Sequence, residues 1–345
     1  MRPSMVRAWL AAGTLCLAAN LFAQTNVITD PVGFVTLTIN GTNTSSFTFL
    51  GLSMTQPVVH QSKITAVNGS QVIDSSASWT NGEFSGAGNA HFIELTSDAG
   101  AGITEDIVSN TSTSLTTASD LSSKITPDST TYKVRKHWTI GTVFGSNNEI
   151  GFGGGPDATS ADNLFILNPL TQQYATYYFK SDGFPTPGWR TAVDPFTDAA
   201  NTVLYLDQGI WVRRKQPTSV STQLVGSVKL GQTLIPVASN QNIVANVYAV
   251  TNLTLQTCNL YTGNPATGVL GGSDPTTADT VSIWNGTGYN IFYYKTDGFP
   301  SPGWRTAVDP FTDVGNTVIP MGSSVRIHSK GHSFDWTVPQ PFSYP

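Results

Sequence analysis

Residues 180–198 read KSDGFPTPGWRTAVDPFTD, and residues 295–313 repeat the stretch as KTDGFPSPGWRTAVDPFTD. The two copies begin 115 residues apart and are identical at 17 of 19 positions. Both differences exchange one small hydroxyl residue for another. A repeat of this quality has to be interpreted as a unit before any single residue is given a role.

The repeat extends upstream of the identical block. Residues 154–162 (GGPDATSAD) match residues 271–279 (GGSDPTTAD) in the pattern GGxDxTxAD, here 117 residues apart. The two-residue difference falls in a turn, where residues 168–173 face the shorter segment 285–288. Because insertions concentrate in turns, the pattern indicates two copies of one folded unit.

Short apolar and aromatic runs separated by Pro, Gly, Asn and Asp recur along the chain, which is typical of an all-β protein. In the first repeat, residues 163–167 and 174–180 are such runs, and Pro185 and Pro187 exclude a helix after them. We expect an all-β fold with an N-terminal β-sandwich or barrel-like domain and two homologous β-meander units. The expected division is residues 24–135 for the N-terminal β domain, 136–216 for unit A, 217–330 for unit B and 331–345 for an aromatic, Pro-rich tail.

The first 23 residues have the features of a signal peptide. Arg2 and Arg7 precede a mostly apolar run at residues 8–19, and Leu-Phe-Ala at 21–23 forms a cleavage site. The run is too short for a membrane span. We therefore expect a secreted protein, extracellular or on the cell surface, without a membrane span after cleavage.

Composition restricts the partners. Charged residues make up 11% of the chain, with 17 Lys+Arg against 22 Asp+Glu and a net charge of −5, which argues against nucleic acid. Of the two cysteines, Cys258 alone would remain after cleavage, so we expect no internal disulfide. The neighbours Thr257 and Asn259 supply no base that would activate the thiol, which favours a buried apolar role.

Motifs for catalysis are weak. A G-x-S-x-G nucleophile elbow is absent from the sequence. His328 and His332 are four residues apart, about 13 Å on an extended strand, which is too far to share one metal ion. His91 and Glu94 are three apart and would face opposite sides of a strand. No cofactor is expected.

The repeated loops carry carboxylates that are candidate calcium ligands, because Ca²⁺ takes oxygen ligands from loops. The three residues of the first copy and their counterparts are Asp182, Asp194, Asp198, Asp297, Asp309 and Asp313. Two upstream pairs, Asp157 with Asp162 and Asp274 with Asp279, are further candidates. The alternative is that each Asp caps a turn through neighbouring backbone groups.

The dipeptides Trp189-Arg190 and Trp304-Arg305 are candidate ligand-binding residues. An exposed Trp can stack on a sugar ring or hold an Arg by cation–π contact. The alternative, which we favour, is that each Trp fills the core of its unit and each Arg pairs with a neighbouring Asp.

Three motifs carry a resemblance to a known family. They are DPVGFV at residues 30–35, HWTIGTVF at 137–144, and the twinned Ala-Asp, Tyr-Tyr and Gly-Trp-Arg motifs of the repeats. Together they resemble an uncharacterised family of secreted, repeat-containing β proteins from Verrucomicrobia-type bacteria, over nearly all of the mature chain. The resemblance implies export and a bacterial origin, and it supplies no catalytic residue.

These observations favour a non-enzymatic extracellular binding or structural protein, with a polysaccharide or matrix as its partner. The alternative is a secreted hydrolase acting on a polysaccharide or an ester. An enzyme would gather unique polar residues in one cleft, whereas a binding protein would present equivalent surfaces on both repeats.

Overall fold

The structure, a computed structural model, describes residues 30–184, 186–299 and 301–344, so the expected signal peptide lies outside the described residues. The described chain consists of antiparallel strands with one five-residue helix, α1 (Ile140–Phe144), and two 3-10 turns. The all-β fold class is therefore confirmed. No helix within the described ranges is long and apolar enough to cross a membrane.

Two five-stranded sheets contain the repeats, and their corresponding strands lie in the same order. From here on, units A and B denote the two sheets together with the strands that pair with them. In unit A the order is β13 (Gly188–Thr191), β12 (Gln173–Lys180), β11 (Asn163–Asn168), β15 (Ile210–Arg214) and β2 (Ser46–Leu50). In unit B the order is β21 (Gly303–Thr306), β20 (Tyr289–Lys295), β19 (Thr280–Trp284), β22 (Ser324–Ser329) and β18 (Asn240–Ala245).

Each unit also has a two-stranded ribbon. The ribbon of unit A pairs β1 (Val32–Ile39) with β16 (Val220–Ser227), and that of unit B pairs β17 (Thr233–Val237) with β23 (Phe334–Val338). The short pair of β10 (Trp138–Thr139) and β14 (Val203–Leu204) in unit A corresponds to a single bridge between Thr254 and Val318 in unit B.

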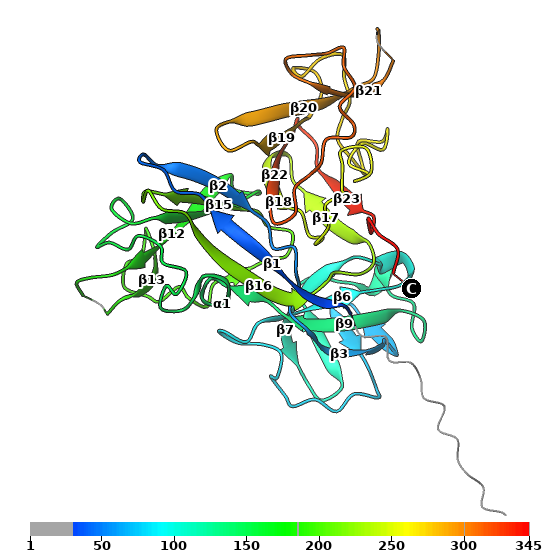
Figure 1. The fold of residues 1–345 in the computed structure, drawn as a ribbon. Coiled ribbons are helices and arrows are strands. Elements are labelled where there is room, and N and C mark those ends of the chain that lie inside the picture. Colours follow the sequence, from blue (N-terminus) through cyan, green and yellow to red (C-terminus); the bar gives the residue numbers. More distant parts are fainter. Residues whose placement is uncertain (1–29, 185, 300, 345) are drawn as a thin grey trace, which may run out of the picture.

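A third, seven-stranded sheet lies between β2 and β10 in the sequence, and we call it the inserted sheet (Figure 1, cyan strands). Its strands, in spatial order, are β3 (Val58–Lys63), β9 (Thr131–Lys136), β6 (His91–Leu95), β7 (Thr104–Asn110), β8 (Ser114–Thr117), β5 (Gln71–Ile73) and β4 (Ala66–Asn68).

Strand pairing groups the chain differently from the sequence-based division. The strands β1 and β2 fall in the expected N-terminal domain but pair with strands of unit A. The strand β16 falls in the range expected for unit B, yet its partner is β1. The strand β23 falls in the expected tail and pairs with β17. The reason is that these partners are far apart in sequence, and local patterns do not specify distant pairings.

Alternation along the strands produces the cores. In β1 the side chains of Val35, Leu37 and Ile39 are buried, whereas the residues between them are exposed. One face of the ribbon therefore covers the apolar core of unit A, as expected for a half-buried antiparallel pair. Units A and B and the inserted sheet each have a core of their own.

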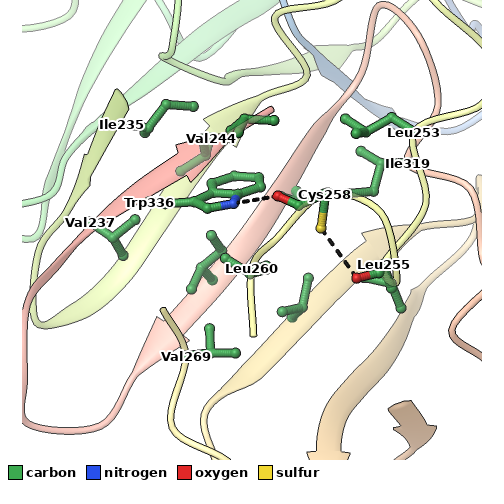
Figure 2. Packing of buried hydrophobic residues seen from close by; sticks show 14 of the residues in the cluster. Ile235, Val237, Val244, Leu253, Leu255, Cys258, Leu260, Val269, Ile319 and Trp336 are labelled. Carbon is green, nitrogen blue, oxygen red and sulfur yellow. Dashed lines mark hydrogen bonds between the residues drawn. The ribbon is translucent and has the colours of Figure 1, made fainter. Parts of the chain in front are cut away.

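The core of unit B surrounds Trp336 and Cys258 (Figure 2). The indole Nε1 of Trp336 donates a hydrogen bond to the carbonyl oxygen of Cys258 at 2.8 Å, and the Cys258 thiol lies 3.4 Å from the carbonyl oxygen of Leu255. Cys258 is fully buried, as the sequence predicts, and burial raises the pKa of its thiol to about 12. The thiol is therefore a packing group in this conformation.

Units A and B meet at an aromatic junction. Phe49 of β2, Leu167 of β11 and Ile243 of β18 are buried there. Four partly buried aromatic side chains pack around them: Phe47, Trp211, Trp284 and Tyr289. Backbone hydrogen bonds cross the same boundary, from Gly209 N to Ile243 O (2.9 Å) and from Ala245 N to Asp207 O (2.8 Å). The junction thus combines apolar packing with backbone pairing.

A buried ion cluster joins the inserted sheet to the segment between β16 and β17. Glu94 of β6 lies 2.5 Å from Lys229 Nζ and 3.3 Å from Arg135 Nε, and all three side chains are buried. Asp30 pairs with Arg135 and, at 2.6 Å, with Lys133. Burial alone would raise the pKa of Glu94, but the charges of Lys229 and Arg135 outweigh it and lower that pKa.

Candidate functional site

The identical sequence block forms the same structure in both units. In each, two loops flank the outermost strand of the five-stranded sheet. We call residues 181–184, 186–187 and 192–198 tip A, and residues 296–299, 301–302 and 307–313 tip B. Gly183 and Gly298 have φ of 76° and 74°, which an Asp-Gly turn supplies at little steric cost. The repeated sequence is therefore a repeated surface.

The tryptophans lie beneath the tips, in the cores. Trp189 and Trp304 are each 1% exposed. The indole Nε1 of Trp189 donates a hydrogen bond to Gly145 O at 2.8 Å, and its ring packs against Phe144, Phe152 and Phe179. The ring of Trp304 packs against Tyr294. This is the position that the core interpretation requires, and it leaves neither indole face accessible to a sugar ring.

The arginines hold the loops to the strand. Arg190 is buried, and its guanidinium donates to the carbonyl oxygens of Trp189 (2.7 Å) and Thr186 (2.8 Å) while it pairs with Asp198 (3.3 Å). Arg305 makes the same set of contacts in tip B, with Trp304, Ser301 and Asp313 at 2.8, 2.6 and 2.8 Å. Each guanidinium therefore connects both loops of its tip, which fixes their conformation.

The carboxylates of the second loop cap turns. Asp194 Oδ1 accepts hydrogen bonds from the backbone N–H groups of Phe196 (2.9 Å) and Thr197 (3.2 Å), and the hydrogen bonds from Thr197 and Phe196 lower its pKa. In tip B, Asp309 accepts from Phe311 and Thr312, and its pKa is lowered in the same way. Asp198 and Asp313 are occupied by the arginines and by one backbone N–H each.

The upstream aspartates are also satisfied by the chain. Asp162 accepts from Gly153 N, Lys215 N and Arg214 Nη1 at 2.6–2.8 Å. Asp279 accepts from two backbone N–H groups at 2.7 Å. Within the described ranges, no three His, Cys, Asp or Glu side chains gather in an arrangement that suits a metal ion. Calcium binding by the tips stays a prediction, and the contacts seen are those of capped turns.

The tips expose large apolar side chains. In tip A, Phe184 is 85%, Val193 95% and Phe196 63% exposed. The counterparts in tip B are exposed almost equally: Phe299 85%, Val308 93% and Phe311 64%. Sequence reasoning singled out the tryptophans and missed these residues. The signal was present, because an apolar residue between turn-forming Gly, Pro and Asp residues has no strand to bury it.

The two tips are more alike in sequence than the strands β11 and β19 of the same units. The strand β11 (NLFILN) and the aligned residues 280–285 (TVSIWN) agree at only two positions, Ile166/Ile283 and Asn168/Asn285. Exposed Phe and Val side chains contribute little to packing. Packing within the chain therefore does not account for their identity in both tips.

Fold and site together describe an all-β protein with two five-stranded sheets of the same strand order, each of which carries an apolar loop tip of nearly the same sequence, and with a seven-stranded sheet between β2 and β10. Comparison of the chain with protein-family models, with curated proteins and with solved structures finds no match.

Proposed function

We propose that this is a secreted, non-enzymatic binding protein that holds an extracellular polysaccharide through its two tips. The observation that carries the proposal is the identity of the exposed apolar side chains in units whose strands β11 and β19 have diverged. A buried residue can be repeated for the sake of packing, but a repeated exposed Phe needs another reason.

The chemistry of the tips suits sugar rings. The rings of Phe184 and Phe196 stand in solvent with their centroids 6.4 Å apart, and the C–H face of a sugar packs on such rings. Each tip has only two short loops, whereas a protein partner of ordinary affinity needs about 20–30 residues on each side. A sugar chain needs one or two aromatic platforms and a few hydrogen-bonding groups.

Charge narrows the class of polysaccharide. Neither loop of either tip contains Lys or Arg, and the nearest cations, Lys180 and Arg190, are buried and hydrogen bonded. The exposed Asp182 and its counterpart Asp297 leave the tips acidic. Carboxylates accept hydrogen bonds from hydroxyl or ammonium groups and repel carboxylate or sulfate groups. The preferred polymer is therefore neutral or carries amino groups.

The test is retention of the mature chain on insoluble cellulose, chitin, xylan and peptidoglycan. We expect retention on at least one neutral or amino-sugar polymer, and loss of it in the double variant Phe184→Ala/Phe299→Ala. The matched control is Leu170→Ala, since Leu170 is as exposed as Phe184 (85%) but lies in a turn outside the tips. Equal retention of wild type and double variant would contradict the proposal, and release of soluble sugar would favour the hydrolase.

A further inference from the structure

The tips lie at separate ends of the molecule. In both five-stranded sheets the tip belongs to one edge strand, β13 or β21, and the opposite edge strand, β2 or β18, contributes to the aromatic junction. Four strand spacings of about 4.8 Å put each tip strand about 19 Å from the inner edge of its sheet. In Figure 1 the β13 and β21 regions accordingly occupy different extremities.

The two units are held by more than a linker. Phe49 of unit A stacks on Trp211, with centroids 5.6 Å apart, and contacts Trp284 of unit B at 5.4 Å. The side-chain amide of Gln172 pairs with the backbone of Gln241, which accepts at 3.0 Å and donates at 3.1 Å. Isolated bridges join Leu50 to Ser323 and Gln208 to Val244. These contacts fix the relative positions of the sheets.

We infer that one molecule bridges two separate polysaccharide strands, instead of clamping one strand with both tips. The inference rests on the proposed function. Two sites on a flexible linker can reach the same strand, and the second contact then gains from a high effective concentration. Sites fixed at separate ends lose that gain on a single strand, but each remains free for a different strand. Tips that differ only by two exchanges between Ser and Thr then join strands of the same polymer.

The inference predicts how single-tip variants behave. Phe184→Ala removes the central ring of tip A and Phe299→Ala that of tip B, and because both rings are exposed we expect folding to be unaffected. For a bridge, one tip suffices for attachment to a strand, so each single variant should bind a short oligosaccharide with an apparent affinity within about twofold of wild type. Cross-linking needs both tips, so each single variant should lose it.

The experiment uses the full mature chain with two soluble polymers, neutral hydroxyethyl cellulose and amine-bearing glycol chitosan, and with cellohexaose and chitohexaose as short probes. Titration calorimetry should give two hexasaccharides per wild-type chain and one per single-tip variant. The viscosity of a solution of the polymer that the protein binds should rise when wild type is added. It should stay at the value of the polymer alone when either single-tip variant is added. Leu170→Ala should behave as wild type in both measurements.

The outcomes separate the two proposals. If wild type binds neither the polymers nor the hexasaccharides, the proposed function fails and the bridge with it. If wild type binds and a single-tip variant loses about 100-fold or more in affinity for the long polymer, both tips share one strand. In that case the bridge is wrong while the binding function stands. A viscosity rise that persists in either single-tip variant would also overturn the bridge.

Discussion

The rings of Phe184 and Phe196 lie side by side at tip A, with centroids 6.4 Å apart and planes inclined by 50°. They come from different loops, and Arg190 holds those loops together from below through Thr186 and Asp198. Burying a Phe side chain is worth about 1.5–3 kcal/mol, so the fold forgoes that stabilisation at both tips. This pair of exposed rings, on loops that Arg190 connects, is the contact surface that we propose.

The first prediction concerns the stability of the tips. Phe184→Ala and Phe299→Ala should each change the free energy of unfolding by no more than about 0.5 kcal/mol, because the rings are mostly exposed. Urea denaturation followed by Trp fluorescence measures this. A loss above 2 kcal/mol would mean that the rings are part of the packing and would remove the reason for a binding role.

The buried tryptophans should behave in the opposite way. Trp189→Ala and Trp304→Ala should each lower the free energy of unfolding by about 3–5 kcal/mol, since each removes a fully buried aromatic ring. The same denaturation measurement applies. Variants that keep wild-type stability and lose retention on polysaccharide would restore the tryptophans as ligand-binding residues.

The ion cluster gives a prediction about assembly of the three sheets. Lys229→Met should destabilise the protein by about 3 kcal/mol, because it leaves Glu94 buried with one cation fewer. In the double variant Lys229→Met/Glu94→Gln the loss should be smaller, since the unpaired charge is gone. If the loss in the double variant equals the sum of the losses in Lys229→Met and in Glu94→Gln measured separately, the pair is not coupled.

Acid should weaken the inserted sheet through Asp74. Burial raises the pKa of this carboxyl, but hydrogen bonds from Ser76 and Tyr132 outweigh burial and lower it from 3.8 to about 2. A lowered folded-state pKa contributes stability above the unfolded-state pKa, and the contribution is lost as the pH falls from about 4 to 2. The free energy of unfolding of wild type should therefore exceed that of Asp74→Asn above pH 4, and the difference should disappear as the pH falls to about 2. An advantage that does not change with pH would exclude this role.

The Cys258 thiol should be silent in the native protein. Its pKa of about 12 and its full burial leave almost no accessible thiolate at pH 8. We expect no reaction with a disulfide reagent over an hour at pH 8, and one thiol per mature chain after denaturation in guanidinium. Rapid reaction of the native chain would indicate that the core around Trp336 opens.

Much of the fold could be predicted from local sequence. The alternation that marks strands and the turn residues between them are short-range signals, and so is the repeat itself. The pairing of β1 with β16 was not predictable, because the paired residues are 181 to 195 positions apart and only the folded chain brings them together. As a result, a chain truncated at Lys215, near the end of the range expected for unit A, lacks β16. Its strand β1 then has no partner, and the ribbon of unit A is incomplete.

The site could be predicted in part. The repeat located both tips, but the sequence does not reveal whether an aromatic side chain within the repeat is buried or exposed. Trp189 and Phe184 are five residues apart, and one is buried while the other is exposed. The pairing of Glu94 with Lys229 was invisible for a related reason, since buried charges leave no local pattern.

The most direct test of the binding role is the dissociation constant of the mature chain on the insoluble polymer that retains it, measured beside Phe184→Ala/Phe299→Ala. We expect the double variant, folded as wild type, to bind at least about 100-fold more weakly, because both tips have lost an exposed ring. A double variant that binds with the wild-type dissociation constant would show that the tips are not the binding surface.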